Sequence, residues 1–258
     1  MAIDVGNTQV VVGLFAEGDG PAELAYHWRV NTQAAYTADE LALQLAQLLA
    51  LDDLRLSVVS GMAVASVVPP VQEALRQLTA RRLGVPLVVV GPGTRTGVNI
   101  LVDSPREVGA DRIADVVAAY ERYGGPTIVV DFGTATNFEV VSAKGEYVGG
   151  VLFPGVEVSL NALTSKAALL PRVDIAAPKA ILGKNTVEQL HSGIFHGFGA
   201  LVEGVCQRLK KEIGPATVVA TGGWAPFLLP AISGIDHHEP WLTLYGLRSI
   251  YNLNYADA

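Results

Sequence analysis

Apolar and polar residues alternate along the chain in patterns that predict short strands and amphipathic helices in both halves. Strand-like segments occur at residues 2–5, 10–15, 24–30, 64–68, 86–90, 127–131, 136–142, 146–152 and 217–221. Helical patterns occupy residues 38–50, 70–83, 107–122, 155–169, 187–212 and 240–250. Strand hairpins followed by strand–helix alternation predict an α/β fold with two lobes, each a mixed β-sheet with flanking helices, and a cleft between them.

The helix expected at residues 38–50 has both a start signal and an apolar face. Thr37 stands before it and Glu40 follows three positions later, which is the arrangement of a capping box. The helix carries a leucine stripe on one face at helical spacing, formed by Leu41, Leu45, Leu48 and Leu49.

A weak internal repeat relates the two halves of the chain. Asp4 and Asp131 each end a short apolar segment, each is followed by a glycine two positions later, and strand-like sequence then resumes. This pattern is typical of a β-hairpin with an acid and a polar turn at its tip. The offset of 131 − 4 = 127 residues is close to half of the 258 residues. The repeat has two possible explanations, a chance match or the duplication of one lobe. Duplication would give lobes at residues 1–118 and 119–258.

Composition narrows the class of protein. Half of the residues are apolar, 17% are charged and mean hydropathy is +0.35, so a sizeable core is expected and disorder is not. No apolar stretch reaches the roughly 18 residues of a membrane span, and no signal peptide is expected. The single cysteine, Cys206, excludes an internal disulfide and suits a reducing cytoplasm. A net charge of −7 argues against nucleic acid or an anionic membrane as the main partner.

Three glycine-containing loops carry candidate chemistry. The loop from Asp4 to Thr8 offers a carboxylate and backbone N–H groups, which suit a phosphate chain with Mg²⁺, although a plain hairpin turn would look the same. The segment 131–136, Asp-Phe-Gly-Thr-Ala-Thr, is a second loop of this kind. Thr221-Gly222-Gly223 follows a strand, and paired glycines let a flat ring approach the backbone, or merely allow a strand-to-helix turn.

A charged pair stands where the helix at 107–122 is expected to begin. Asp111 and Arg112 follow Gly109 and Ala110. The acid can be only a first-turn charge that the helix dipole favours. The alternative is a catalytic pair, in which Asp111 takes a proton from an alcohol while Arg112 holds a carboxylate.

Five motifs follow one another along the chain: DVGNT at 4–8, GADR at 109–112, DFGTAT at 131–136, GKNT at 183–186 and TGG at 221–223. With these motifs in this order, the whole chain resembles the type III pantothenate kinases. This family belongs to the actin-like and sugar-kinase superfamily. Its duplicated ribonuclease-H-like lobes would account for the internal repeat.

The resemblance implies ATP-dependent phosphorylation of the primary hydroxyl of pantothenate, the first step of coenzyme A synthesis. It implies Asp111 as proton acceptor and Asp131 as ligand of a monovalent cation, K⁺ or NH₄⁺, with Mg²⁺ arriving with ATP near Asp4. The ATP site would comprise Asp4, Val5, Gly6, Asn7, Thr8, Gln9, Val10, Val11, Thr134, Gly222 and Gly223. The pantothenate site would comprise Gly109, Ala110, Asp111, Arg112, Thr186 and the position of Val102. A homodimer with sites close to the subunit interface is also implied.

The chain departs from the family pattern at several positions. Val102 stands where the family often has a tyrosine that contacts pantothenate, Asn137 where a threonine is common, Asp115 where an asparagine is common, and Phe153 where a smaller residue is usual. None of these changes removes a catalytic group. Val102 leaves open a kinase of another small alcohol, or a polyphosphate hydrolase, on the same scaffold. A non-catalytic nucleotide-binding regulator or filament is a further alternative, which the Asp111-Arg112 pair disfavours.

Overall fold

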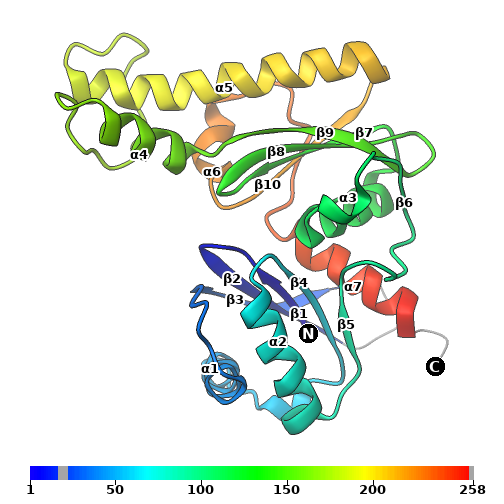
Figure 1. Cartoon of the computed structure of the whole chain (residues 1–258). Helices are drawn as coiled ribbons and strands as arrows, with labels where there is room; N and C mark the ends of the chain where they lie inside the picture. The colour runs from blue at the N-terminus through cyan, green and yellow to red at the C-terminus, as the bar shows by residue number, and fades with distance from the viewer. Residues whose placement is uncertain (17–22, 256–258) are drawn as a thin grey trace. The chain divides into compact units, whose positions relative to one another are not determined.

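The structure is a computed structural model that describes residues 1–16 and 23–255, and it contains two compact units (Figure 1). The first unit comprises Met1–Asn99, Asp103–Ala118 and Leu242–Ala258, and the second comprises Ile100–Val102 and Ala119–Trp241. Each unit is built on its own mixed β-sheet, as the sequence pattern predicts.

The first unit has a five-stranded sheet in the order β3-β2-β1-β4-β5. Its strands are β1 (Ala2–Val5), β2 (Gln9–Phe15), β3 (Leu24–Asn31), β4 (Met62–Ser66) and β5 (Leu87–Val89). β1 is central, pairing antiparallel with β2 and parallel with β4. Helices α1 (Ala38–Ala50) and α2 (Pro69–Leu78) cover one face, where Ile3 and Val5 join their leucines in the core.

Helix α1 begins as its sequence predicts. Oγ1 of Thr37 accepts a hydrogen bond from the backbone N–H of Glu40 at 3.2 Å, and the backbone N–H of Thr37 donates to the Glu40 carboxylate at 2.8 Å. This confirms the capping box, which satisfies N–H groups that the first turn would otherwise leave unpaired. Leu41, Leu45 and Leu49 are buried.

The last helix belongs to the first unit, although we expected residues 119–258 to form one lobe. Helix α7 (Leu242–Tyr255) packs on β1, β4 and β5. Close approach fixes it there, because a methyl group at Gly61 would lie 1.9 Å from the Tyr251 hydroxyl. The division at 119–258 is therefore wrong for this helix, since an apolar helix face does not reveal in the sequence which sheet it will cover.

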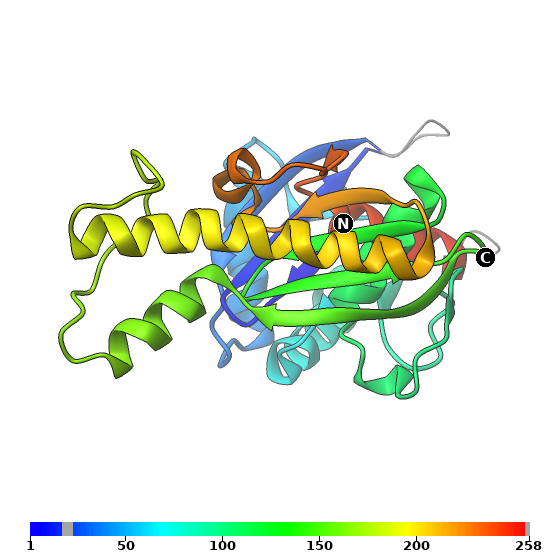
Figure 2. The ribbon, with the colours of Figure 1, turned by 90° about the horizontal axis from the view of Figure 1, so that it is seen from above.

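The second unit has a six-stranded sheet in the order β11-β10-β7-β8-β9-β6. Its strands are β6 (Asn99–Ile100), β7 (Thr127–Phe132), β8 (Ala135–Val141), β9 (Glu146–Pro154), β10 (Thr217–Thr221) and β11 (His237–His238). Helices α4 (Val156–Lys166), α5 (Thr186–Ile213) and α6 (Ala225–Leu228) follow, and α5 runs along the sheet (Figure 2). Val130, Phe132 and Phe138 join α5 and α6 in one buried core.

The two sheets place their aspartates at matching positions. Asp4 is the next-to-last residue of β1, and Asp131 is the next-to-last residue of β7. Both strands pair antiparallel with the next strand of the chain, and parallel with a strand on the other side. The internal repeat thus corresponds to matching strand topology in the two units.

The sequence pattern is wrong in several details of the elements. Helix α2 ends at Leu78, and residues 79–83 form a π-helical turn that closes at Gly84 with a φ of +65°. The two-residue strands β6 and β11 and the short helix α6 have no periodic signal long enough to predict. Helix α3 (Ala110–Tyr123) begins three residues later than expected. Within the described part of the chain, no helix combines the length and hydrophobicity that crossing a membrane requires.

Candidate functional site

The first candidate loop is a tight hairpin turn between β1 and β2. The backbone N–H of Gly6 donates to the carbonyl of Gln9 at 3.0 Å, and Thr32 after β3 holds the turn from outside. Thr32 Oγ1 donates to the Gly6 carbonyl at 2.7 Å, and its N–H donates to the Thr8 carbonyl at 2.9 Å. Asn7 and Thr8 are exposed. The turn is therefore a fixed, exposed loop.

Asp4 faces the side of the first sheet that carries α7. In β1, Asp4 shares a face with Ala2, and Ala2 pairs with Gly13, against which Leu244 of α7 packs. Its strand neighbours are Val11 on β2 and Ala65 on β4. The carboxylate is half-buried. Asp4 thus presents a negative charge at the end of β1, beside the exposed turn.

Helix α3 presents the second candidate group at its N-terminus. Asp111 lies in the first turn, half-buried, and its Oδ1 accepts from the backbone N–H of Arg112 at 2.9 Å. A methyl group at Gly109 would lie 2.3 Å from this Oδ1, so only glycine leaves the carboxylate where it is. The carboxylate lies beside the partial positive charge of the helix N-terminus, an interaction that stabilises a negative charge there. Such an acid can accept a proton from an alcohol.

Contacts with α7 hold the start of α3 in place. Thr243 Oγ1 donates to the buried carboxylate of Asp115 at 2.7 Å. A methyl group at Gly246 would lie 1.9 Å from the Ala114 carbonyl, so the two helices meet at backbone distance. Asp111 is one turn from Asp115, and the same packing therefore positions it.

The second unit brings two of the predicted loops together. A methyl group at Gly222 would lie 2.4 Å from Oδ1 of Asp131 and 2.5 Å from the backbone nitrogen of Phe132. The N–H of Trp224 donates to the Phe132 carbonyl at 3.0 Å. Gly222 has a φ of +92°, which a residue with a side chain rarely adopts. Asp131 and Gly222 therefore lie in direct contact, at the ends of the neighbouring strands β7 and β10.

The residue before α4 supports the turn that follows Asp131. Gly133 N–H donates to the Ala135 carbonyl at 2.9 Å, and Gly155 N–H donates to the Thr134 carbonyl at 3.0 Å. A methyl group at Gly155 would lie 2.3 Å from that carbonyl oxygen. Thr134 itself is exposed. Thr134 is thus an exposed residue on a turn that backbone hydrogen bonds hold in place.

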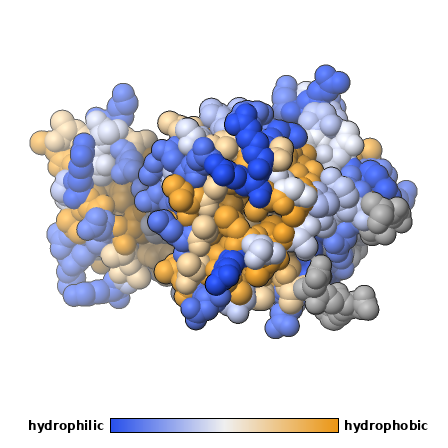
Figure 3. Space-filling model, turned by 90° about the horizontal axis from the view of Figure 1, so that it is seen from below, coloured by the Kyte–Doolittle hydropathy of each residue, from blue (hydrophilic) through white to orange (hydrophobic). Residues whose placement is uncertain are grey.

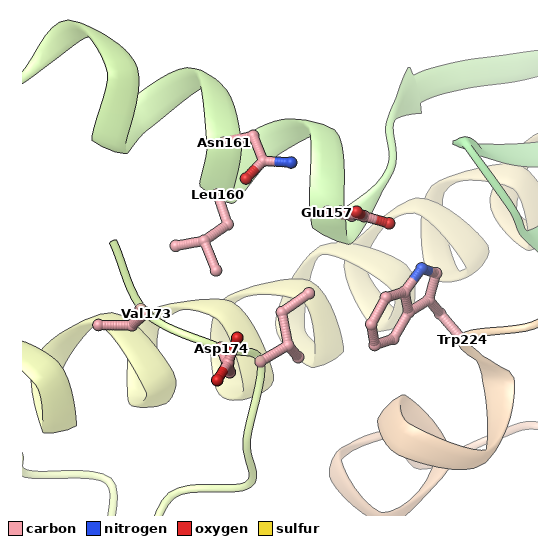
Figure 4. A pocket seen from close by; sticks show the side chains of 7 residues that line it. Glu157, Leu160, Asn161, Val173, Asp174 and Trp224 are labelled. Atoms are coloured by element: carbon pink, nitrogen blue, oxygen red, sulfur yellow. The ribbon is translucent and has the colours of Figure 1, made fainter. Parts of the chain in front are cut away.

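A cavity of about 270 Å³ lies beside Trp224, the residue that follows the paired glycines (Figure 4). Helix α4, the segment after it and the residue after the paired glycines form its walls, through Glu157, Leu160, Asn161, Val173, Asp174, Ile175 and Trp224. An indole face, aliphatic side chains and carbonyl or carboxylate acceptors suit a flat ring with N–H donors. The sequence pattern does not predict these residues, although Trp224 directly follows the TGG motif.

The segment at 183–186 caps a helix. Asn185 Oδ1 accepts from the Glu188 N–H at 3.0 Å, and the Lys184 N–H donates to the Glu188 carboxylate at 2.8 Å. Thr186 begins α5 and is exposed. Val102 is half-buried and belongs to the segment Ile100–Val102, which is part of the second unit. Within residues 1–16 and 23–255, no side-chain hydrogen bond or ion pair assigns a role to either residue.

The predicted site residues fall into two groups by unit. Asp4 to Val11 and Gly109 to Arg112 are in the first unit, whereas Asp131, Thr134 and the paired glycines are in the second. His237 and His238 form the exposed strand β11, where His237 stacks on Tyr123 at 4.3 Å between ring centroids. Burial and the neighbouring Glu239 carboxylate raise the pKa of Tyr123 to about 12. Among residues 1–16 and 23–255, no cluster of three His, Cys, Asp or Glu side chains could hold a metal ion.

Comparison with known proteins identifies the family. The model of the type III pantothenate kinase family matches residues 1–208. Type III pantothenate kinases of Streptomyces griseus subsp. griseus and Acidothermus cellulolyticus are 52% and 50% identical to the chain, covering 100% of it and 99% of each relative. A ROK family glucokinase from Streptomyces griseus, solved with glucose and AMPPNP, shares the fold with a TM-score of 0.51 at 11% identity, over 95% of this chain and 96% of that one. The fold is that of the actin-like and sugar kinases, and the chain belongs to the type III pantothenate kinase family.

Proposed function

We propose that the chain transfers the γ-phosphoryl group of ATP to the primary hydroxyl of pantothenate, giving 4'-phosphopantothenate. The observation that carries this proposal is the family match, which extends over the full length of relatives that bear this name. Phosphoryl transfer needs positioned groups and neutralised charge more than covalent chemistry from the protein. The loops described above supply groups of this kind.

The turn at the end of β1 is the proposed phosphate loop, comprising residues 4–11. Its exposed residues lie beside the Asp4 carboxylate. Mg²⁺ keeps several waters and is usually bound through one or two carboxylates and substrate phosphates. A single aspartate beside a phosphate loop fits this chemistry, so Asp4 would hold the hydrated ion that arrives with ATP.

Asp111 is the proposed proton acceptor. Its half-buried carboxylate accepts a hydrogen bond from the backbone N–H of Arg112 in the first turn of α3, so it is positioned before a substrate arrives. Arg112 would hold the pantothenate carboxylate, since a guanidinium matches a carboxylate in a two-point contact. Gly109, Ala110 and Thr186 complete the proposed pantothenate site, and Val102 would contribute only apolar contact there.

The second unit supplies the proposed nucleotide contacts. Thr134 would contact a phosphate, and Gly222 and Gly223 would let the adenosine approach the backbone. The cavity beside Trp224 is the proposed place of the adenine ring, because the amino group of adenine can donate to Asn161 or to the carboxylates of Glu157 and Asp174. Asp131 would bind the monovalent cation, K⁺ or NH₄⁺.

Exposed apolar side chains support a proposed homodimer. Leu169, Ile181 and Leu182 lie on the connection between α4 and α5 and are 97%, 73% and 77% exposed. Leu152 on β9 is 64% exposed. The first unit also exposes leucines, and Figure 3 shows apolar surface gathered on the face drawn there. Exposed apolar surface of this kind marks interaction sites.

The cytoplasm is the proposed place of action. Cys206 is a free, buried thiol, and burial raises its pKa to about 11. A neutral, inaccessible thiol is compatible with a reducing compartment and needs no oxidised partner.

The test is a coupled assay of ADP release with purified protein, ATP, Mg²⁺ and K⁺, in which pantothenate is compared with other small primary alcohols. We expect turnover with pantothenate above every other alcohol, and much slower turnover when Na⁺ replaces K⁺. Faster turnover with another alcohol would overturn the substrate assignment. Equal turnover in K⁺ and Na⁺ would overturn the cation role.

A further inference from the structure

Asn137 on β8 holds a buried polar atom that needs a partner. The side chain is 8% exposed, and its Oδ1 has no hydrogen-bond partner among the residues that the structure describes. Leaving a buried acceptor unpaired is unfavourable, because the oxygen loses its hydrogen bonds to water and gains none in their place. Unpaired buried groups in folded proteins usually mark a bound water, an ion or a functional site.

The strand register places Asn137 beside the aspartate of the second unit. Asp131 on β7 is directly opposite Asn137 on β8, and on its other side it is in register with Thr221 on β10. Directly opposed residues of antiparallel strands point to the same face, with Cβ atoms about 4.5–5.5 Å apart. Thr221, Asp131 and Asn137 therefore form a line across three strands, which we call the oxygen row because each side chain carries at least one oxygen.

The matching place in the first unit is different. There Asp4 is flanked by Val11 on β2 and Ala65 on β4, at the positions that Asn137 and Thr221 take beside Asp131. The two sheets thus provide an internal comparison. An aspartate with apolar neighbours offers one carboxylate, whereas the oxygen row offers a carboxylate, an amide carbonyl and a hydroxyl.

The other unpaired atom on β8 points away from the oxygen row. Thr136 is fully buried, and its Oγ1 also lacks a partner among the described residues. It is opposite Phe132, whose side chain belongs to the core with α5 and α6. Successive strand residues face opposite sides of a sheet, so Thr136 cannot join the row.

We propose that Asn137 is a further ligand of the monovalent cation at Asp131, through its Oδ1. The inference rests on the proposed function, which places the cation at Asp131. Hard cations such as K⁺ take oxygen ligands, and carbonyl oxygens replace their hydration water well. The buried carbonyl then has a positively charged partner.

Direct cation binding tests the proposal without relying on catalysis. Isothermal titration with K⁺ at constant ionic strength would compare wild type with Asn137→Leu, which removes the oxygen at similar size, and Asn137→Thr, which retains a hydroxyl. Thr136→Val is the matched control, since it removes the other unpaired oxygen of the same strand from the opposite face. ²⁰⁵Tl NMR with Tl⁺ in place of K⁺ gives a second readout of the same site.

We expect Asn137→Leu to weaken K⁺ binding by about tenfold or more, within the range found for residues that support metal sites. Asn137→Thr should fall between it and wild type, and Thr136→Val should bind as wild type does. Wild-type affinity in Asn137→Leu would overturn the proposal. If that variant does not fold, wild-type affinity and an unchanged Tl⁺ signal in Asn137→Thr would overturn it. Failure to phosphorylate pantothenate in the wild type would instead refute the proposed function, whatever the titrations show.

Discussion

The contact between Gly222 and Asp131 makes a sharp prediction about the substitution Gly222→Ala. The added methyl group would lie 2.4 Å from Oδ1 of Asp131 and 2.5 Å from the Phe132 backbone nitrogen. One of these neighbours is a side-chain oxygen that can move, but the other is backbone. The substitution therefore pushes the β10 loop away from β7 and displaces the carboxylate proposed to hold the cation.

The size of the effect follows from two costs. A side chain at a φ of +92° costs about 1–2 kcal/mol, and overpacking against fixed atoms costs about 1–3 kcal/mol more. Gly234→Ala is the matched control, since Gly234 has a φ of +85° and no described atom within 4 Å of the added methyl group. The control should pay only the first cost, about 1–2 kcal/mol.

Urea unfolding, followed by circular dichroism, gives the free energy of unfolding of both variants. We expect Gly222→Ala to lose about 1–3 kcal/mol more than Gly234→Ala, and to bind ATP and K⁺ more weakly by calorimetry. Equal losses in the two variants, with unchanged ATP and K⁺ binding in Gly222→Ala, would refute the close approach of the two loops.

Three further predictions concern the base, the first helix and the thiol. Asp111→Asn should abolish phosphoryl transfer while calorimetry still detects ATP binding, and near-normal turnover would assign the base elsewhere. Thr37→Ala removes the cap of α1 and should lower the free energy of unfolding by about 1 kcal/mol in urea, whereas no change would show that the cap is dispensable. Cys206, whose pKa burial raises to about 11, should resist iodoacetamide at pH 8 in the folded protein and react after unfolding. Rapid labelling of the folded protein would contradict its burial. Since unfolding returns this pKa to about 9, stability should fall as pH rises above 9.

Much of the fold can be predicted from the sequence because its elements carry long, regular patterns. The helix at 38–50 combines a capping box with four leucines on one side, and both signals are local. Helix α7 is equally clear as a helix, but its place on β1, β4 and β5 depends on Gly61 and Gly246, which allow close contact only once the sheet and α3 exist. Edge strands of two residues, such as β11, depend wholly on a neighbouring strand.

The candidate site is likewise predictable from the sequence only where its residues belong to local motifs. Asp111, Asp131 and the paired glycines belong to motifs that can be read along the chain. The contact between Asp131 and Gly222 is non-local, because the two residues are about ninety positions apart in the sequence. The motifs alone do not show that these residues lie close together in space. Asn137 is visible in the sequence only as a departure from the family, whereas the register shows that it is opposite Asp131.

The identity of the phosphorylated product decides whether this chain phosphorylates pantothenate. Purified protein would be incubated with ATP, Mg²⁺, K⁺ and pantothenate, and the products would be followed by ³¹P NMR and mass spectrometry. We expect one 4'-phosphopantothenate for each ADP formed. ADP with free phosphate and no phosphopantothenate, or no consumption of ATP at all, would contradict it.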